Sequence, residues 1–266
     1  MKRLKIGIYQ MNMRFLDASY NHDHYRKSIE EFNIVDTDIL VMPETWNLGF
    51  FPKINLKKLS YDEKNKTIDE MALLARKNDI NIVAGSIINY ENENVYNTSI
   101  SFDNQGKIIN EYNKIHLFSY MGEDKYFSPG EKVSIFYIGG IKCATIICYD
   151  IRFTELVRYL ALKGVQILFV VAQWPLSRIE HWRLLNRCRA VENQIFVVAV
   201  NSCGKADEVI YGGNSMVIDP WGNVLCQLGE NEEFKNVEIN LDELQKIRNT
   251  INIYRDRKYY LYKIEE

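Results

Sequence analysis

Three side chains of complementary chemistry, Glu44, Lys114 and Cys148, follow three separate apolar or β-forming runs of the sequence. The runs are DILVMP before the glutamate, KIINEYN before the lysine and CATII before the cysteine. In open α/β sheets, side chains that follow the carboxyl ends of strands can converge on one cleft. A carboxylate, an ammonium and a thiol brought together in this way form a plausible set for nucleophilic acyl transfer.

In acyl transfer each of the three residues would have a separate role. The thiolate is the nucleophile, but an ordinary cysteine has a pKa of about 8.5 and is mostly thiol at neutral pH. A nearby cation, a base and the helix expected to begin near Arg152 would all favour the thiolate of Cys148. Lys114 could also stabilise the oxyanion that forms on a carbonyl. Glu44 could take the thiol proton, pass it to the departing amine and later activate water.

Each of these residues also has an ordinary structural interpretation. Taken alone, a cysteine in an apolar run is an inert buried thiol, Glu44 is a loop carboxylate in solvent, and Lys114 is a solvated lysine. The ordinary interpretation is weakest for Lys114, because the lysine follows an apolar β run and burying an unpaired ammonium costs free energy. The sequence therefore predicts a charged partner for Lys114.

The segments that would position these side chains alternate between strand and helix patterns. Apolar stripes at helical spacing predict helices that lie on a sheet: one is Ile68, Met71, Ala72 and Ala75, and another is Phe153, Leu156, Val157, Leu160 and Ala161, closed by Gly164. The predicted strands are KIGIYQM, DILVM, INIVAGSII, KCATIIC, VQILFVVA and IFVVAV. VQILFVVA and IFVVAV are apolar at every position, so we expect them at the centre of a sheet covered on both faces. This alternation indicates an α/β fold.

Two stretches of the chain look alike. SFDNQGKII at 101–109 and VIDPWGNVL at 217–225 each predict a strand, an Asp, a turn containing Gly and a returning strand. Their separation of 116 residues fits two similar halves of a pseudo-symmetric sheet sandwich, although hairpins commonly look this way. No Pro-, Gly- or Ser-rich linker divides the chain, so we expect a single domain over residues 1–266.

Composition narrows the classes of partner. Of 266 residues, 47% are hydrophobic, and the formal net charge is −2 with no Lys/Arg block, so we expect neither nucleic acid nor membrane as a partner. The start, MKRLKIGIYQMNMRF, is interrupted by polar residues and predicts a first strand of a cytoplasmic protein, not a signal peptide. The five cysteines are well separated and predict free thiols. Cys143 and Cys148 should point to opposite faces of their strand.

Other motifs give weaker signals. A Cys–His enzyme would need an imidazole beside the thiol, and only His116 lies near one of the three stretches; a structural role for it is the simpler reading. His22 and His24 form an isolated His-x-His pair, which is weak evidence for a metal, and we predict none. The sequence contains no G-x-S-x-G elbow, Walker loop or G-x-G-x-x-G fingerprint.

Taken together, the three stretches resemble the carbon–nitrogen hydrolase family, also called the nitrilase superfamily. The matching segments are LVMPETWNLGF, YNKIHLF and ATIICYDIRFTEL, with 70 residues from Glu44 to Lys114 and 34 from Lys114 to Cys148. The likeness continues through GEDKYFSPG, WRLLNRCRAVENQ, GGNSMVIDPWGNVL and RDRKYYLY, and so covers essentially the whole chain. The signature of that family is a Glu–Lys–Cys triad.

The resemblance implies further features as expectations. They are a four-layer αββα sandwich, assembly as a homodimer, no metal or organic cofactor, and a small amide as substrate. Glu123 would be a second acidic residue that positions substrate, and the backbone N–H of Tyr149 would join Lys114 in the oxyanion hole. The stretch after the cysteine looks like the amidase branches, and HLFSYMGEDKYFSPG with WPLSRIEHWRLLNRCRAVENQ looks most like the omega-amidases, which act on amides such as 2-oxoglutaramate.

Several neighbouring residues complete the hypothesis. Phe118, Tyr120 and Trp174 are candidates for the substrate-binding wall, with ordinary aromatic packing as the alternative for each. Arg152 and Glu155 are expected to brace the turn that carries the nucleophile. The sequence departs from many relatives at Thr154, where they have Pro, and at Asn214, where they have His.

Three functions remain open at this stage. The expected one is cysteine-dependent release of ammonia from a small amide through a thioester acyl-enzyme. A related enzyme could act on another amide or carbamoyl compound, or transfer the acyl group to an acceptor other than water. A non-catalytic binding protein on the same fold is the third, and an intact triad argues against it.

Overall fold

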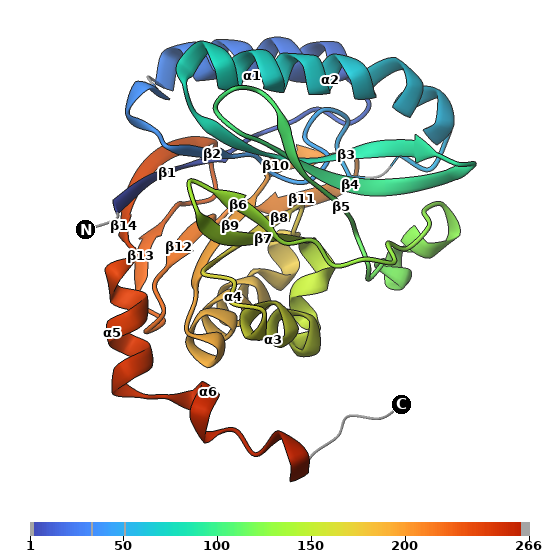
Figure 1. Cartoon of the computed structure of the whole chain (residues 1–266). Coiled ribbons are helices and arrows are strands. Elements are labelled where there is room, and N and C mark those ends of the chain that lie inside the picture. The colour runs from blue at the N-terminus through green and yellow to red at the C-terminus, as the bar shows by residue number, and fades with distance from the viewer. Residues whose placement is uncertain (1–2, 33, 51, 262–266) are drawn as a thin grey trace.

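The protein has four layers, helix, sheet, sheet and helix, in a computed structural model that describes residues 3–32, 34–50 and 52–261 (Figure 1). Helices α1 and α2 cover the outer face of the first sheet, and α3 and α4 cover the outer face of the second. The expected αββα sandwich is therefore confirmed.

The first sheet has six strands in the order β14-β1-β2-β3-β4-β5. Strands β1, β2 and β3 are parallel, and the other strands pair antiparallel to their neighbours. The bounds are β1 Arg3–Gln10, β2 Ile39–Val41, β3 Asn81–Glu91, β4 Asn94–Phe102, β5 Ile108–Asn113 and β14 Glu233–Asn240.

The second sheet has the order β13-β12-β9-β8-β7-β6, again with three parallel strands, β7, β8 and β9, flanked by antiparallel ones. Its bounds are β6 Phe136–Ile138, β7 Ile141–Ile147, β8 Ile167–Ala172, β9 Phe196–Asn201, β12 Met216–Ile218 and β13 Val224–Gln227. Every residue of β8 and β9 is buried, which confirms that these two runs form the centre of a sheet. A separate hairpin consists of β10 Cys203–Ala206 and β11 Val209–Gly212.

The helices follow the predicted apolar stripes. Met71, Ala72 and Ala75 are buried on α2, and the stripe from Leu156 to Ala161 is buried on α3. The helices are α1 Ala18–Phe32, α2 Leu56–Asn78, α3 Thr154–Leu162, α4 Ile179–Asn193, α5 Asp242–Thr250 and α6 Ile253–Asp256. Short 3₁₀ helices cover Ile34–Asp36, Ser119–Met121, Glu123–Lys125, Cys148–Arg152, Leu176–Arg178 and Tyr259–Leu261.

The core lies on both faces of each sheet. Along β1, Ile6 and Ile8 point into the core between the sheets, whereas Tyr9 packs on the opposite side under α1 and α2. This alternation follows from the two-residue period of a strand, and each fully buried side chain of this size stabilises the fold by roughly 1.5–3 kcal/mol. Because both faces are covered, the strands read as continuous apolar runs.

The two sheets repeat one plan. Strands β1, β2, β3, β4 and β5 of the first sheet correspond, in that order, to β7, β8, β9, β12 and β13 of the second. The edge strands β14 and β6 also correspond, and each is antiparallel to its neighbour. The two hairpins noted in the sequence join β4 to β5 and β12 to β13. In both turns an Asp carboxylate accepts two backbone N–H groups: Asp103 from Gln105 and Lys107, and Asp219 from Trp221 and Asn223. The sequence similarity therefore marks equivalent places in two similar halves.

The chain after β14 runs along the side of the second half and then passes below α4 and α3 in the view of Figure 1. On α5, Arg248 donates to the carbonyl of Gln194, and the Gln194 side chain donates to the carbonyl of Ile251. Beyond α6 the side chains of Tyr259, Tyr260 and Leu261 are exposed. Among the helices described here, none combines the length and the apolar character needed to cross a bilayer.

Candidate active site

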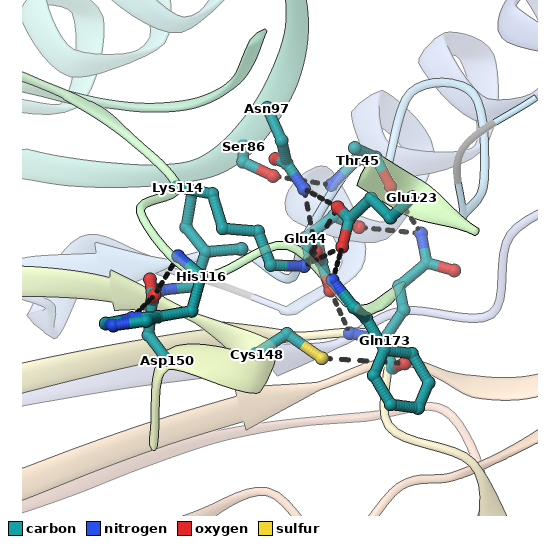
Figure 2. A network of polar contacts seen from close by, with 12 residues as sticks. Glu44, Thr45, Ser86, Asn97, Lys114, His116, Glu123, Cys148, Asp150 and Gln173 are labelled. Carbon is teal, nitrogen blue, oxygen red and sulfur yellow. Dashed lines mark hydrogen bonds and ion pairs between the residues drawn. The ribbon is translucent and has the colours of Figure 1, made fainter. Parts of the chain in front are cut away.

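Glu44 follows β2 and lies fully buried between the two sheets. Its Oε1 accepts from Asn97 Nδ2 at 2.8 Å and from Lys114 Nζ at 3.0 Å, and its Oε2 accepts the backbone N–H of Gln173 at 2.8 Å. Three donors therefore fix the direction of the carboxylate (Figure 2). The exposed loop position considered from the sequence is wrong.

Lys114 follows β5 directly and is also fully buried. Its ammonium lies between two carboxylates, 3.0 Å from Glu44 Oε1 and 2.9 Å from Glu123 Oε2. The predicted charged partner of the lysine is confirmed, and the structure supplies two. Breaking one half of a buried pair leaves an uncompensated charge, so these three residues depend on one another.

Glu123 lies at the start of its short 3₁₀ helix, and it is turned toward Lys114. Its carboxylate accepts from the lysine through both oxygens, from the backbone N–H of Phe118 at 2.6 Å and from Asn97 at 3.4 Å. It is fully buried and is not among the residues that line the cavity beside Cys148. The geometry shows contact of Glu123 with Lys114, and its expected role in positioning substrate stays a prediction.

Cys148 follows β7 directly and begins the 3₁₀ helix Cys148–Arg152. Its φ of 46° lies in the left-handed region, which is costly for a residue with a Cβ and persists only where the surroundings hold it. The Sγ lies 4.0 Å from the carbonyl oxygen of Gln173, at the end of β8. The strand end and the sharp turn together present the thiol toward the cavity.

The Asp150 carboxylate stabilises this turn by accepting hydrogen bonds. Its carboxylate is fully buried and accepts from the backbone N–H of Ile147, from the Tyr112 hydroxyl at 2.7 Å, and from both the backbone N–H and the ring Nδ1 of His116. The His116 ring also stacks on Phe153 at 3.5 Å between centroids. Figure 2 shows His116 and Asp150 apart from the Glu44 cluster, so the structural reading of His116 is confirmed.

The electrostatics of the cluster correct one expectation. Burial raises the pKa of Cys148 well above its usual value, and Glu44 raises it further against the opposing effect of Lys114. Burial also raises the pKa of Glu44. For Lys114, burial acts to lower the pKa, but Glu123 and Glu44 outweigh it and raise it. The expectation of a lowered thiol pKa is wrong, because burial and the two carboxylates together outweigh the effect of Lys114.

A cavity of about 570 Å³ opens above Cys148. The three predicted wall residues all line it: Trp174 is buried, Phe118 is half-buried, and Tyr120 is 83% exposed at the mouth. Tyr149 lines it as well, with its ring against Phe118. Their contact with substrate stays a prediction.

Two guanidinium groups line this cavity, those of Arg152 and Arg178, and the sequence reading did not assign either of them to the substrate-binding wall. Arg152 lies over the Trp174 ring at 4.9 Å, and Arg178 over the Phe118 ring at 5.3 Å. Burial lowers the pKa of Arg152, and the charge of Arg178 lowers it further, so the two cations are near each other. No carboxylate among the described residues forms an ion pair with either. The expectation that Arg152 braces the turn rather than touches substrate stays a prediction, and the structure places Arg152 in the cavity lining.

The bracing comes from α4 instead. Arg189 donates through Nε to the carbonyl of Ile151 at 2.9 Å and through a second nitrogen to the carbonyl of Arg152. Glu155, the other expected brace, is exposed in the first turn of α3. Thr154 is likewise exposed, and Asn214 bonds with Arg183 away from the residues that line the cavity.

The two histidines of the His-x-His pair are used separately. His22 is fully buried and bonds with Glu70 at 2.7 Å, and His24 bonds with Glu232 at 2.8 Å. Across the described part of the chain, no three His, Cys, Asp or Glu side chains are grouped to hold a metal ion.

Sequence reasoning also missed three buried polar residues that hold the cluster in place. They are Asn97, Asp150 and Gln173. Each interrupts an otherwise apolar or strand-forming run, which is the signal that could have found them, because a buried polar group needs partners.

Comparison with known proteins agrees with this geometry. Residues 5–249 match the family model described as carbon-nitrogen hydrolase. The chain is 40% identical over 225 residues to a 2-oxoglutaramate amidase of Bacillus subtilis, covering 85% of this chain and 86% of that protein. It is 37% identical to a protein of Staphylococcus aureus named hydrolase in agr operon, covering 98% and 100%.

Solved structures give the same picture. A superfamily protein from Xanthomonas campestris with an arsenic adduct in its active site aligns over 100% of both chains with a TM-score of 0.90 and 26% identity. An amidase mutant from Nesterenkonia sp., with an acetamide moiety added covalently at its active-site cysteine, aligns with a TM-score of 0.83 and 25% identity, covering 95% of this chain and 96% of that one.

Proposed function

The chain belongs to the carbon–nitrogen hydrolase family, and from this premise we propose that it removes the terminal amide of a small dicarboxylate monoamide. The model substrate is 2-oxoglutaramate, on which the named Bacillus relative acts. Cys148 would carry the acyl group as a thioester, and ammonia would be released.

The pair of arginines at the cavity carries the choice of substrate class. Arg152 and Arg178 line the same cavity as Cys148, and no carboxylate of the described chain forms an ion pair with either. Glu208 also lines this cavity, and Arg152 bonds with the ring of His181. A guanidinium binds a carboxylate through charge-assisted hydrogen bonds. An amide that carries a carboxylate at its other end would place that carboxylate on the arginines and its carbonyl beside the thiol.

The first half of the proposed reaction makes the thioester. Glu44, which is near enough to Cys148 to raise the pKa of its thiol, takes the thiol proton as the sulfur attacks the amide carbon. The oxyanion is stabilised by Lys114 and by the N–H of Tyr149. Glu44 then gives the proton to the amide nitrogen, the C–N bond breaks, and ammonia leaves.

The second half releases the acid. Glu44 removes a proton from water, the resulting hydroxide attacks the thioester carbon, and the proton returns to the departing sulfur of Cys148. A resting thiol with a raised pKa suits this cycle, because sulfur is deprotonated only when a substrate is present to receive its electrons. Glu123 supports the cycle by holding Lys114 between two carboxylates.

The proposal extends to the whole molecule. Residues 1–266 would form one domain that works in the cytoplasm as a homodimer. Exposed apolar side chains on α3 and α4 support an interface there: they are Tyr159, Leu162, Leu184 and Val191. Light scattering on the purified protein gives the mass directly, and a monomer would contradict this part.

The test of function is ammonia release from 2-oxoglutaramate, succinamate, a neutral amide of similar length such as butyramide, and one nitrile. Release that favours the two anionic amides and vanishes in Cys148→Ala is expected. No release from any of them would contradict the proposed reaction.

The arginines have a test of their own. Arg178→Met and Arg152→Met should each raise KM for succinamate about 10–100-fold, the scale of a lost hydrogen bond to a charged group, and change butyramide hydrolysis far less. Arg255→Met, an exposed arginine on α6, is the matched control. Equal effects on the anionic and neutral amides would contradict the assignment.

A further inference from the structure

Gln173 stands where the two halves of the site meet. It follows β8, its side chain is almost fully buried, and it lies in the floor of the cavity next to Cys148. The residues around it come from both sheets, because Glu44 and Thr45 follow β2 of the first sheet.

Gln173 holds Glu44 at two points. Its backbone N–H donates to Glu44 Oε2 at 2.8 Å, and its side-chain Nε2 donates to the backbone carbonyl of Glu44 at 2.7 Å and to Thr45 Oγ1 at 2.8 Å. A primary amide has two N–H groups in one plane, so it can serve both acceptors at once. Both the carboxylate and the main chain of Glu44 are thereby tied to β8 (Figure 2).

The main chain held in this way is strained. Thr45 has a φ of 39°, which is an uncommon conformation for a β-branched residue. Its N–H donates to Ser86 Oγ at 3.1 Å, and its hydroxyl accepts from Gln173. Without these contacts the peptide after Glu44 would relax toward an ordinary conformation and take the carboxylate with it.

Gln173 also borders the nucleophile. Its carbonyl oxygen lies 4.0 Å from Cys148 Sγ, and Cys148 itself has a left-handed φ of 46°. Two strained turns, one beside the base and one at the thiol, therefore both contact this one residue.

A second buried glutamine shows what a purely structural role looks like. Gln10 donates from Nε2 to the carbonyls of Gly229 and Asn231, and its Oε1 accepts the N–H of Ser215, so both ends of its amide are satisfied. In Gln173 the Oε1 has no hydrogen-bond partner among the described residues, so the chain holds only the donor end of this amide.

We propose that the Gln173 side chain is a positioning residue for catalysis: it clamps the strained Glu44–Thr45 peptide so that the Glu44 carboxylate meets the Cys148 thiol. This inference rests on the proposed chemistry of Glu44 and Cys148. It adds a role for a residue that touches no reacting atom through its side chain.

The first test compares Gln173→Met with Gln10→Met, which remove equivalent amides of similar burial. Gln173→Met should lower kcat for the preferred amide about 10–100-fold, the scale of a misplaced catalytic group, with KM changed less than about threefold. Gln10→Met should lower the unfolding midpoint and leave kcat within about threefold. Equal kcat in Gln173→Met and wild type would overturn the proposal.

A pH profile separates positioning from general destabilisation. The titratable groups near Glu44 are Lys114, Glu123, Cys148 and Tyr211, and the N–H of Gln173 acts to lower the Glu44 pKa. If the clamp is lost, that hydrogen bond weakens and the acid limb of kcat/KM should move to higher pH. An unmoved limb together with unchanged kcat would count against the clamp.

Two milder variants apply if Gln173→Met does not fold. Thr45→Val removes the hydroxyl acceptor and keeps the shape, so kcat should fall, and Thr45→Ser should restore most of it. Wild-type kcat in Thr45→Val would overturn the proposal.

Alkylation of the thiols separates this inference from the proposed function. The rate at which iodoacetamide modifies Cys148, measured by peptide mass spectrometry against the exposed Cys188, should fall in Gln173→Met or Thr45→Val. This readout needs no amide substrate. If wild type releases no ammonia but the alkylation rate still depends on Gln173, then the proposed substrate is wrong and the clamp stands. An alkylation rate independent of Gln173 would overturn the clamp.

Discussion

The two sheets share one plan but contribute different chemistry. Each has three parallel strands flanked by antiparallel ones in the same order. From the first sheet come the charged groups, Glu44 after β2 and Lys114 after β5, whereas the second supplies Cys148 after β7 and the amide of Gln173 after β8. The difference teaches that neither half holds a working site by itself.

Glu44 and Gln173 make the comparison concrete. Strands β2 and β8 occupy corresponding places in the two sheets, and these two residues, one after each strand, hydrogen-bond to each other. At the corresponding places the first half carries a carboxylate and the second a neutral amide. A second carboxylate at the Gln173 position would repel Glu44 and could not donate to its carbonyl.

The largest effect should come from removing Glu44, the proposed general base, which follows a strand of the first sheet. Glu44→Gln keeps the shape but cannot take the thiol proton, so kcat should fall about 10²–10⁴-fold, the range for a general acid–base. Single-turnover kinetics with mass spectrometry of the Cys148 peptide will show which half-reaction stops. Rapid formation and breakdown of the thioester in this variant would remove Glu44 from the role.

Loss of the cation of the first sheet should rank second. Lys114→Met should lower kcat about 10²–10³-fold, the scale of one oxyanion donor. It also leaves Glu44 and Glu123 facing each other without a counter-ion, so the double variant with Glu123→Gln serves as the control for stability. An effect confined to KM would contradict an oxyanion role.

The smallest effects should come from the equivalent hairpins, which test the likeness of the two halves away from the site. Asp103→Ala and Asp219→Ala each remove an acceptor for two backbone N–H groups, so each should lower the free energy of unfolding by about 1–2 kcal/mol without changing kcat. Asp219 is nearly fully buried and also accepts from the Asn223 side chain, so its loss should cost more. Urea unfolding measures the free energy of unfolding of both variants. An unchanged value in either one would show that the two turns do not contribute equally to stability.

Much of the architecture could be predicted from sequence, because burial on both faces leaves a direct record in apolar runs. VQILFVVA and IFVVAV indicated the centre of the second sheet, and the repeated Asp-and-Gly turn indicated corresponding hairpins. The three strand ends also identified residues that the structure brings together, two from the first sheet and one from the second, because the sheets pack face to face.

The electrostatic details could not be predicted in the same way. The raised pKa of Cys148 comes first from burial and then from the balance between Lys114 and the carboxylates of Glu44 and Glu123. Glu123 lies 79 positions after Glu44 in the chain, so their common contact with Lys114 appears only in the folded structure.

 The same limit applies to Gln173 and Arg178: a polar residue beside an apolar run looks the same in sequence whether it clamps a loop, binds a substrate or faces solvent.

The burial of the reacting groups between the sheets has a consequence for how the protein matures. Glu44 and Gln173 are 129 positions apart in the chain, so their hydrogen bond is a long-range contact that requires the two sheets to come together. Until the second sheet docks on the first, Cys148 lacks Glu44 and Lys114, the two partners that the proposed reaction needs. The proposed activity would therefore arise in the same step that completes the core.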